Sequence, residues 1–249
     1  MYLKSIEINS DGFPTHDLYP FNIRVLNSTA RIEFSSPITF FVGRNGSGKS
    51  ALLDAIARKS RLLPWGGTKA HRVHENPYET QLANFLALTE NPRHSYGFHF
   101  RAEAFFNFAA SLDDIILDDP DRDHYFGGKS LNVVSHGESF LTFFKSYTFQ
   151  LDGLYLLDEP EAALSPHSQL EFVQILLDAV RTGRKQYIIA THSPIIMGCP
   201  GAKILTFDAA AIEQIDYRLT EHYSLYREFM SDPEKFLHPQ VLHDNGFHG

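Results

Sequence analysis

The sequence has few of the residues on which several protein classes depend. Its single cysteine, Cys199, excludes internal disulfides, Cys-rich zinc fingers and a paired-cysteine zinc hook. No apolar run approaches the 18 residues of a membrane-spanning helix, and residues 1–7 lack the features of a secretory signal. The 22 lysines and arginines are outnumbered by 30 aspartates and glutamates, and this net charge of −8 is not the basic footprint of a nucleic-acid-binding protein. We therefore expect a soluble, cytoplasmic, globular protein.

The order of apolar segments predicts an α/β fold. Hydrophobic residues make up 43% of the chain and charged residues 21%, which excludes wholesale disorder. Three short apolar runs have the composition of buried strands: 38–42, 154–157 and 187–190. Two helical patterns lie among them: 51–63, stopped by Pro64, and 167–182, followed by Gly183. We predict one domain, 1–249, with a helical insertion over roughly 60–150.

A glycine-rich segment directly follows the first of these strands. Gly43–Ser50 matches the pattern G-x-x-x-x-G-K-[ST] of a phosphate-binding loop. Glycines let successive backbone N–H groups turn toward a phosphate, and the N-terminus of the next helix adds partial positive charge. Lys49 is expected to reach the β- and γ-phosphates, and Ser50 to bind Mg²⁺. The predicted nucleotide-binding residues of the loop are Gly43, Arg44, Asn45, Gly46, Ser47, Gly48, Lys49 and Ser50.

Two adjacent carboxylates end the second predicted strand. Asp158 and Glu159 would lie at the carboxyl edge of a parallel sheet, where such folds bind their ligands. One carboxylate there can hold Mg²⁺, and its neighbour can orient and deprotonate an attacking water. We assign the first role to Asp158 and the second to Glu159, and interpret Glu161 as a solvated or capping acid.

Three further segments occur in the order typical of one class of ATPase. Val134–Glu138 (VSHGE) stands where a signature loop is expected, Ala162–Pro166 follows the acids as a D-loop does, and His192 ends the third predicted strand. Together with the phosphate loop and the acids, these segments resemble the ABC class of ATPases. The amino-acid sequences of these motifs are most similar to those of compact, stand-alone bacterial ATPases of that class. The resemblance covers residues 38–195.

The resemblance implies a P-loop NTPase fold, an ABC-type ATPase head, that binds ATP and Mg²⁺. Two copies would sandwich the nucleotides head to tail, as a homodimer induced by ATP. The catalytic residues would be Glu159, which activates water, His192, which reads the γ-phosphate, and Lys49. The signature residues that would complete the site of the opposite subunit are Ser135, Gly137 and Glu138.

Some positions depart from the pattern of the class. The signature is usually Leu-Ser-Gly-Gly-Gln, whereas here His136 replaces the first glycine and Glu138 replaces the glutamine, bringing like charge toward ATP. The glutamine that links Mg²⁺ to the helical part is not obvious; Glu103 is our choice as the metal-linking residue and Gln81 is the alternative. The candidates for stacking on adenine are Tyr19 and Phe21, both interpreted first as core residues.

Two charged segments lie between the phosphate loop and the signature. Residues 58–72 contain five basic residues and no acid, and residues 113–123 contain six aspartates and one arginine. Such runs are most often solvated faces, which is our first interpretation. Alternatively, the basic run, with Arg58, Lys59 and Arg61, docks an unidentified protein partner or a phosphate backbone, although the net charge does not support nucleic acid.

The resemblance to the ABC class implies a dimer that closes on ATP and reopens after slow hydrolysis, and that thereby drives or gates a partner. Two alternatives stay open: an ATP-gated binding module with little turnover, and the energy-coupling subunit of an ABC transporter whose membrane partner is a separate chain. The stretch from Gly43 to Ser135 is too short for the long coiled-coil arms of chromosome-maintenance ATPases.

Overall fold

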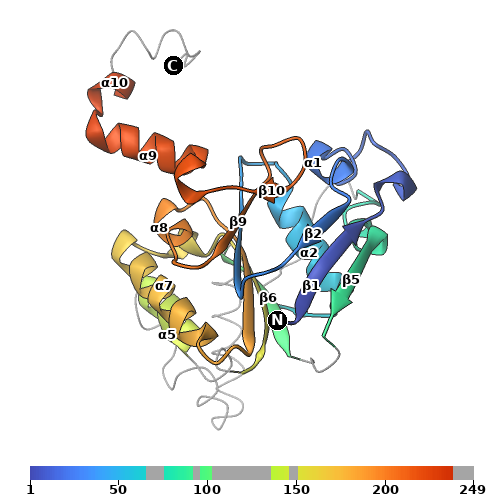
Figure 1. The fold of residues 1–249 in the computed structure, drawn as a ribbon, viewed down its shortest axis with the longest axis horizontal. Coiled ribbons are helices and arrows are strands. Elements are labelled where there is room, and N and C mark those ends of the chain that lie inside the picture. The colour runs from blue at the N-terminus through green and yellow to red at the C-terminus, as the bar shows by residue number, and fades with distance from the viewer. Residues whose placement is uncertain (66–75, 92–95, 103–135, 146–150, 238–249) are drawn as a thin grey trace.

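The strands that carry the predicted motifs lie side by side in one sheet. The computed structural model describes residues 1–65, 76–91, 96–102, 136–145 and 151–237 (Figure 1). Within these ranges a seven-stranded sheet has the order β10-β9-β3-β8-β7-β6-β4, and only β9 and β10 pair antiparallel. Its strands are β3 (Ile38–Val42), β4 (Leu63–Trp65), β6 (Gly97–Arg101), β7 (Gly153–Asp158), β8 (Lys185–Ala190), β9 (Lys203–Thr206) and β10 (Glu213–Gln214).

A smaller antiparallel sheet packs beside the larger one, with α2 between them (Figure 1). In the described residues it has the order β2-β1-β5, from β1 (Leu3–Ile8), β2 (Arg31–Glu33) and β5 (Leu86–Glu90). The described α-helices are α1 (Arg24–Asn27), α2 (Lys49–Lys59), α5 (His136–Lys145), α7 (Pro166–Val180), α8 (Pro194–Met197), α9 (Glu221–Ser231) and α10 (Glu234–Leu237).

The central strands are apolar because both of their faces are covered. Every residue of β3, β7 and β8 is buried, as is usual in a parallel sheet with layers on both sides. Alternate side chains enter different cores: Leu154 and Leu156 join the core with α2 and the small sheet, whereas Tyr155 and Leu157 join the core under α5 and α7. This burial fixes the direction of β7, and with it the position of the acids at its end.

Helix α9 differs from the other long helices because none of its residues is buried. It begins at the N-cap Thr220, whose side chain accepts a hydrogen bond from the Tyr223 N–H. From this start near α8 it extends away from both sheets toward α10 (Figure 1). The partly buried residues of α9, His222, Tyr223 and Ser224, lie in its first turn.

The predicted strands are present as β3, β7 and β8, but the stretch 60–150 differs from expectation. Helix α2 ends at Lys59 rather than residue 63, because Leu63–Trp65 joins the edge of the large sheet, where a proline is tolerated. Strands β5 and β6 also lie in this stretch. None of the described helices combines the length and apolar character needed to cross a membrane.

Candidate functional site

The predicted site residues come together because four parallel strands end at the same edge of the sheet. The glycine-rich loop follows β3, Asp158 is the last residue of β7, and His192 comes two residues after β8. Asp208 comes two residues after β9. This carboxyl edge is where open α/β sheets bind ligands.

The loop after β3 needs glycine on geometric grounds. Gly48 has φ of 109°, and a Cβ there would lie 2.8 Å from Ile23 Cγ2, so a side chain would be both strained and crowded. Lys49 follows as the first residue of α2 and is buried; its Nζ donates to the Gly43 and Arg44 carbonyl oxygens at 2.7 and 2.9 Å. Burial lowers the pKa of Lys49, although nearby carboxylates oppose this. The ammonium therefore lies inside the loop.

A hydroxyl and a carboxylate face each other beside this loop. Ser50 Oγ donates to Asp158 Oδ1 at 2.9 Å. Asp158 is buried, and desolvation raises its pKa to about 6, against the effects of the Ser50 hydrogen bond and of Arg101. Arg101 is the register partner of Asp158 across β6 and β7, with Nε 3.9 Å from Asp158 Oδ2. Hydroxyl and carboxylate oxygens are the donor set that Mg²⁺ prefers.

The second carboxylate and the histidine form another contact at this edge. Glu159 Oε1 lies 3.5 Å from His192 Nε2, and the Glu159 side chain is 44% exposed, so water can reach it. His192 Nε2 is itself buried, with no hydrogen-bond partner in the part of the chain that the structure describes. Burial, aided by Lys49, lowers the pKa of His192 to about 4, so its imidazole is neutral near pH 7.

Glu161 contributes to the site in a way that the sequence analysis did not predict. Its Oε1 accepts a hydrogen bond from the backbone N–H of His192 at 2.5 Å, and burial raises the pKa of its carboxyl group. Of its two predicted roles, a solvated or a capping acid, the solvated one is therefore wrong. Instead, Glu161 fixes the backbone at the histidine.

A pocket of about 370 Å³ opens over these groups. One of the two candidate adenine-stacking residues, Tyr19, lines it and is 44% exposed, whereas the other, Phe21, is fully buried in the core. Inside the loop, Ser47 Oγ is buried without a hydrogen-bond partner among the described residues. The residues that line the pocket are Tyr19, Asn45, Gly46, Gly48, Lys49, Ser50, Ala51 and Glu159. A glycine cradle, a buried ammonium and a hydroxyl–carboxylate pair fit a magnesium nucleotide.

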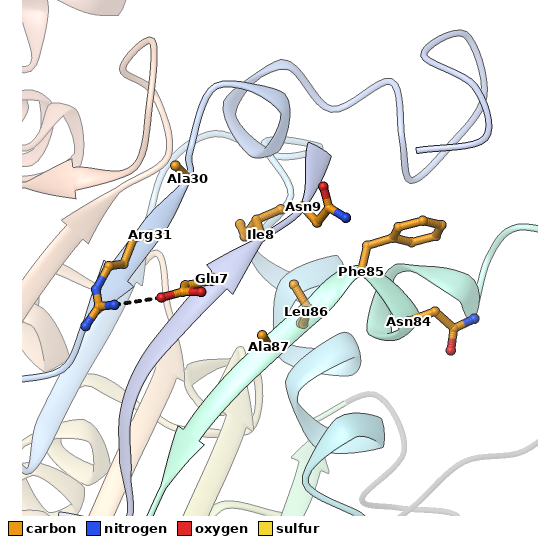
Figure 2. Close-up of a pocket in the computed structure, with 9 residues that line it drawn as sticks. All are labelled: Glu7, Ile8, Asn9, Ala30, Arg31, Asn84, Phe85, Leu86 and Ala87. Atoms are coloured by element: carbon orange, nitrogen blue, oxygen red, sulfur yellow. Dashed lines mark hydrogen bonds and ion pairs between the residues drawn. The ribbon is translucent and has the colours of Figure 1, made fainter. Parts of the chain in front are cut away.

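A second pocket, of about 540 Å³, lies on the small sheet (Figure 2). Its charged side chains, Glu7 and Arg31, are register partners on β1 and β2 and bind each other at 2.7 Å. Because both are half-exposed and already paired, this pocket offers little chemistry compared with the phosphate loop.

Several site residues escaped the sequence analysis. Asp208 Oδ1 accepts from the Arg44 N–H at 2.8 Å; its place just after a buried strand was a usable signal. Glu221 and His222, at the start of α9, contact Arg44 and His192. No motif marks these two residues, because the contacts depend on the path of the chain after β10.

Other predicted positions lie elsewhere or outside the described residues. Gln81, the alternative metal-linking residue, uses its amide to donate to the Pro77 carbonyl oxygen in its own loop. Glu103 and Ser135 are outside the described residues, as is the aspartate run at 113–123. Gly137 and Glu138 lie in the first turn of α5.

Comparison with known proteins gives two family matches. Residues 20–58 match a family described as an AAA domain, and residues 139–198 match one described as "AAA domain, putative AbiEii toxin, Type IV TA system". No curated protein matches the chain.

Solved structures similar to this chain include an SMC head domain and a part of an ABC transporter complex. The SMC head domain from Thermotoga maritima is 18% identical, with 87% of this chain and 100% of that chain covered and a TM-score of 0.47. The structure of cbiO1 from Clostridium perfringens, part of the ABC transporter complex cbiONQ, is 16% identical, with 94% and 97% covered and a TM-score of 0.48.

The parallel sheet with its phosphate loop between β3 and α2 defines a P-loop NTPase fold. The two family matches both describe an AAA domain and support the AAA/ABC-like ATPase inferred from the sequence.

Proposed function

We propose that the chain binds Mg-ATP and hydrolyses it to ADP and phosphate. The observation that carries this proposal is the pair of contacts at one sheet edge, Ser50 with Asp158 and Glu159 with His192, beside the buried ammonium of Lys49. One pair suits a metal and the other suits a nucleophilic water. Phosphoryl transfer requires these two functions next to a phosphate cradle.

Each residue then has a distinct task. Lys49 and the loop N–H groups bind the phosphates, while Ser50 and Asp158 hold Mg²⁺, which when bound neutralises charge that develops on the phosphate oxygens. Glu159 orients water and accepts its proton. His192 Nε2 donates a hydrogen bond to the γ-phosphate, and Tyr19 stacks on the base.

The proposal includes a second copy of the chain. Ser135 and the Gly137 N–H of one subunit would donate to the γ-phosphate of the other, with Glu138 next to them in the signature, and Glu103 would link the metal to the segment before α5. The homodimer would form on ATP binding, act in the cytoplasm, and open after hydrolysis to drive or gate a protein partner. The exposed basic residues at the end of α2 offer that partner a surface.

The test is the solution mass of Glu159→Gln with and without Mg-ATP, measured by light scattering, together with phosphate release by the wild type. We expect ATP to double the mass of the variant and the wild type to release phosphate. Lys49→Ala should stay a monomer, and Glu213→Gln on β10 should behave as wild type. A monomer that binds ATP would overturn the dimer, and binding without phosphate release would favour an ATP-gated binding module.

A further inference from the structure

The first turn of α9 touches the nucleotide-binding edge through two consecutive residues. Glu221 forms an ion pair with Arg44 of the phosphate loop, with Oε2 2.9 Å from Nε. His222 Nε2 lies 2.9 Å from His192 Nδ1. The same turn therefore contacts both the loop that would bind phosphate and the histidine that would read it.

This turn is anchored from the other side as well. Thr220 is 2% exposed, and its Oγ1 donates to the Tyr217 carbonyl oxygen at 2.8 Å. The Tyr217 hydroxyl in turn donates to the carbonyl oxygen of Pro194 at 2.7 Å, two residues after His192. These contacts form a continuous path from His192 through Pro194, Tyr217 and Thr220 to His222. The surrounding structure therefore fixes the relative position of the two imidazoles.

The two ring nitrogens of His192 need different hydrogen-bonding roles. A neutral imidazole has one N–H donor and one acceptor nitrogen. On one side, Nε2 faces the Glu159 carboxylate, which can only accept when ionised. The proton of His192 is therefore favoured on Nε2, which leaves Nδ1 as an acceptor. The partner that donates to Nδ1 is then the Nε2–H of His222.

The surroundings keep both rings neutral, which this assignment requires. Burial lowers the pKa of His222 and of His192, and the positive charge of Lys49 lowers both further. The carboxylates of Asp208 and Glu221 act in the opposite direction on His222 but do not reverse the shift.

We infer that His222 is a positioning residue: it donates to His192 Nδ1 and so fixes the tautomer whose Nε2–H points to Glu159 and the γ-phosphate. The inference rests on the proposed function only for its effect on hydrolysis. The tautomer itself is a property of the protein without nucleotide. A ring nitrogen that is set by the hydrogen bond on its opposite side is a recurring device in histidine sites.

The first test is long-range ¹H–¹⁵N NMR of the histidine rings in the full chain without nucleotide, assigned with His192→Gln and His222→Gln. In the wild type, both rings should carry their proton on Nε2. In His222→Phe, the Nδ1–H form of His192 should become populated. A wild-type His192 protonated on Nδ1 would overturn the inference, whatever the ATPase activity.

The second test uses two variants that differ in donor ability. His222→Gln offers an amide N–H at similar reach, whereas His222→Phe offers none. We expect kcat to fall about tenfold or more in His222→Phe, the size of loss seen when the outer hydrogen-bond partner of a metal-ligating histidine is removed, with little change in KM. His222→Gln should recover most of the rate, and Leu225→Ala, exposed on the same helix, should match the wild type.

The two proposals fail in different ways. Full activity of His222→Phe in a hydrolysing wild type would overturn the role of His222 and leave the ATPase intact. A wild type that binds ATP without hydrolysis, but whose His192 changes tautomer only in His222→Phe, would support the positioning role and overturn hydrolysis. Equal losses in the Phe and Gln variants would indicate packing and would overturn the donor assignment.

Discussion

Glu159 has a backbone conformation that a side chain normally avoids. Its φ and ψ are both 51°, in the left-handed region, whereas the neighbouring Asp158 is the last residue of a regular strand. For a residue with a Cβ, this conformation costs on the order of 1–2 kcal/mol. The turn separates the directions of the two carboxylates, so that one meets Ser50 and the other meets His192. Strain of this kind, held by the surrounding structure, is common at functional sites.

A pair of variants measures this strain. Glu159→Ala retains the Cβ in the left-handed region, whereas Glu159→Gly does not, so the glycine variant should be more stable by about 1 kcal/mol. Both should lose the proposed hydrolysis, because neither has a carboxylate. Urea denaturation gives the difference directly. If the alanine variant were equally or more stable, the position would carry no strain.

His99 makes the unfolding free energy depend on pH, and a substitution at this one position can isolate its contribution. The ring is buried on β6, and burial, followed by the charges of Arg101 and Arg58, lowers its pKa to about 3. The unfolded chain takes up this proton near pH 6.5, so between pH 6.5 and 3 the unfolded state binds more protons and stability falls as pH falls. From pH 7 to 5, His99 should remove about 2 kcal/mol of unfolding free energy.

The comparison is with His99→Leu, which keeps an apolar volume on the strand and removes the titrating group. Its unfolding free energy in urea should fall less steeply than that of the wild type between pH 7 and 5. Identical slopes for the two proteins would mean that His99 is protonated in the fold or reached by water.

At the scale of elements, one side chain joins two helices beside the proposed γ-phosphate sensor. Ser193 Oγ accepts from the backbone N–H groups of Ile195 and Ile196, both at 3.2 Å, and donates to Gln169 on α7 at 2.5 Å. It thus caps α8 and links it to α7 immediately after His192. Because the residue is buried, water cannot replace these bonds.

Removing the hydroxyl should therefore cost more at Ser193 than at an exposed cap. We expect Ser193→Ala to lower the unfolding free energy by about 2 kcal/mol, and Ser165→Ala, whose hydroxyl caps α7 in solvent, by less than about 1 kcal/mol. Thermal or urea denaturation measures both. Similar losses at the two sites would show that the link to α7 adds nothing.

The elements also show how far a sequence can predict this protein. Strands β3, β7 and β8 were predicted because burial on both faces gives unbroken apolar runs. Strand β4 was absorbed into a predicted insertion, since an edge strand containing Pro64 has no such pattern. Lys49, Asp158 and His192 were marked by motifs at strand ends. By contrast, His222 reaches His192 only through tertiary folding, which no local pattern encodes.

At the scale of the whole molecule, the two sheets are joined through a polar side chain in the core. Gln186 of β8 is fully buried, and its Oε1 accepts from the Tyr2 and Leu3 N–H groups at 2.8 and 2.9 Å. Its Nε2 donates to the Leu3 carbonyl oxygen at 2.9 Å. One amide therefore satisfies three backbone groups at the start of β1, across 183 residues of chain.

Gln186→Leu tests whether this amide links the two sheets. The leucine fills a similar volume but leaves buried backbone groups of β1 without partners, which should cost about 3 kcal/mol or more. Ile188→Val, two residues along the same strand and equally buried, should cost about 1 kcal/mol through lost packing alone. Urea denaturation gives both values, and hydrogen exchange should show lost protection at the N–H groups of Tyr2 and Leu3. If Gln186→Leu cost no more than Ile188→Val, apolar packing alone would hold the small sheet in place.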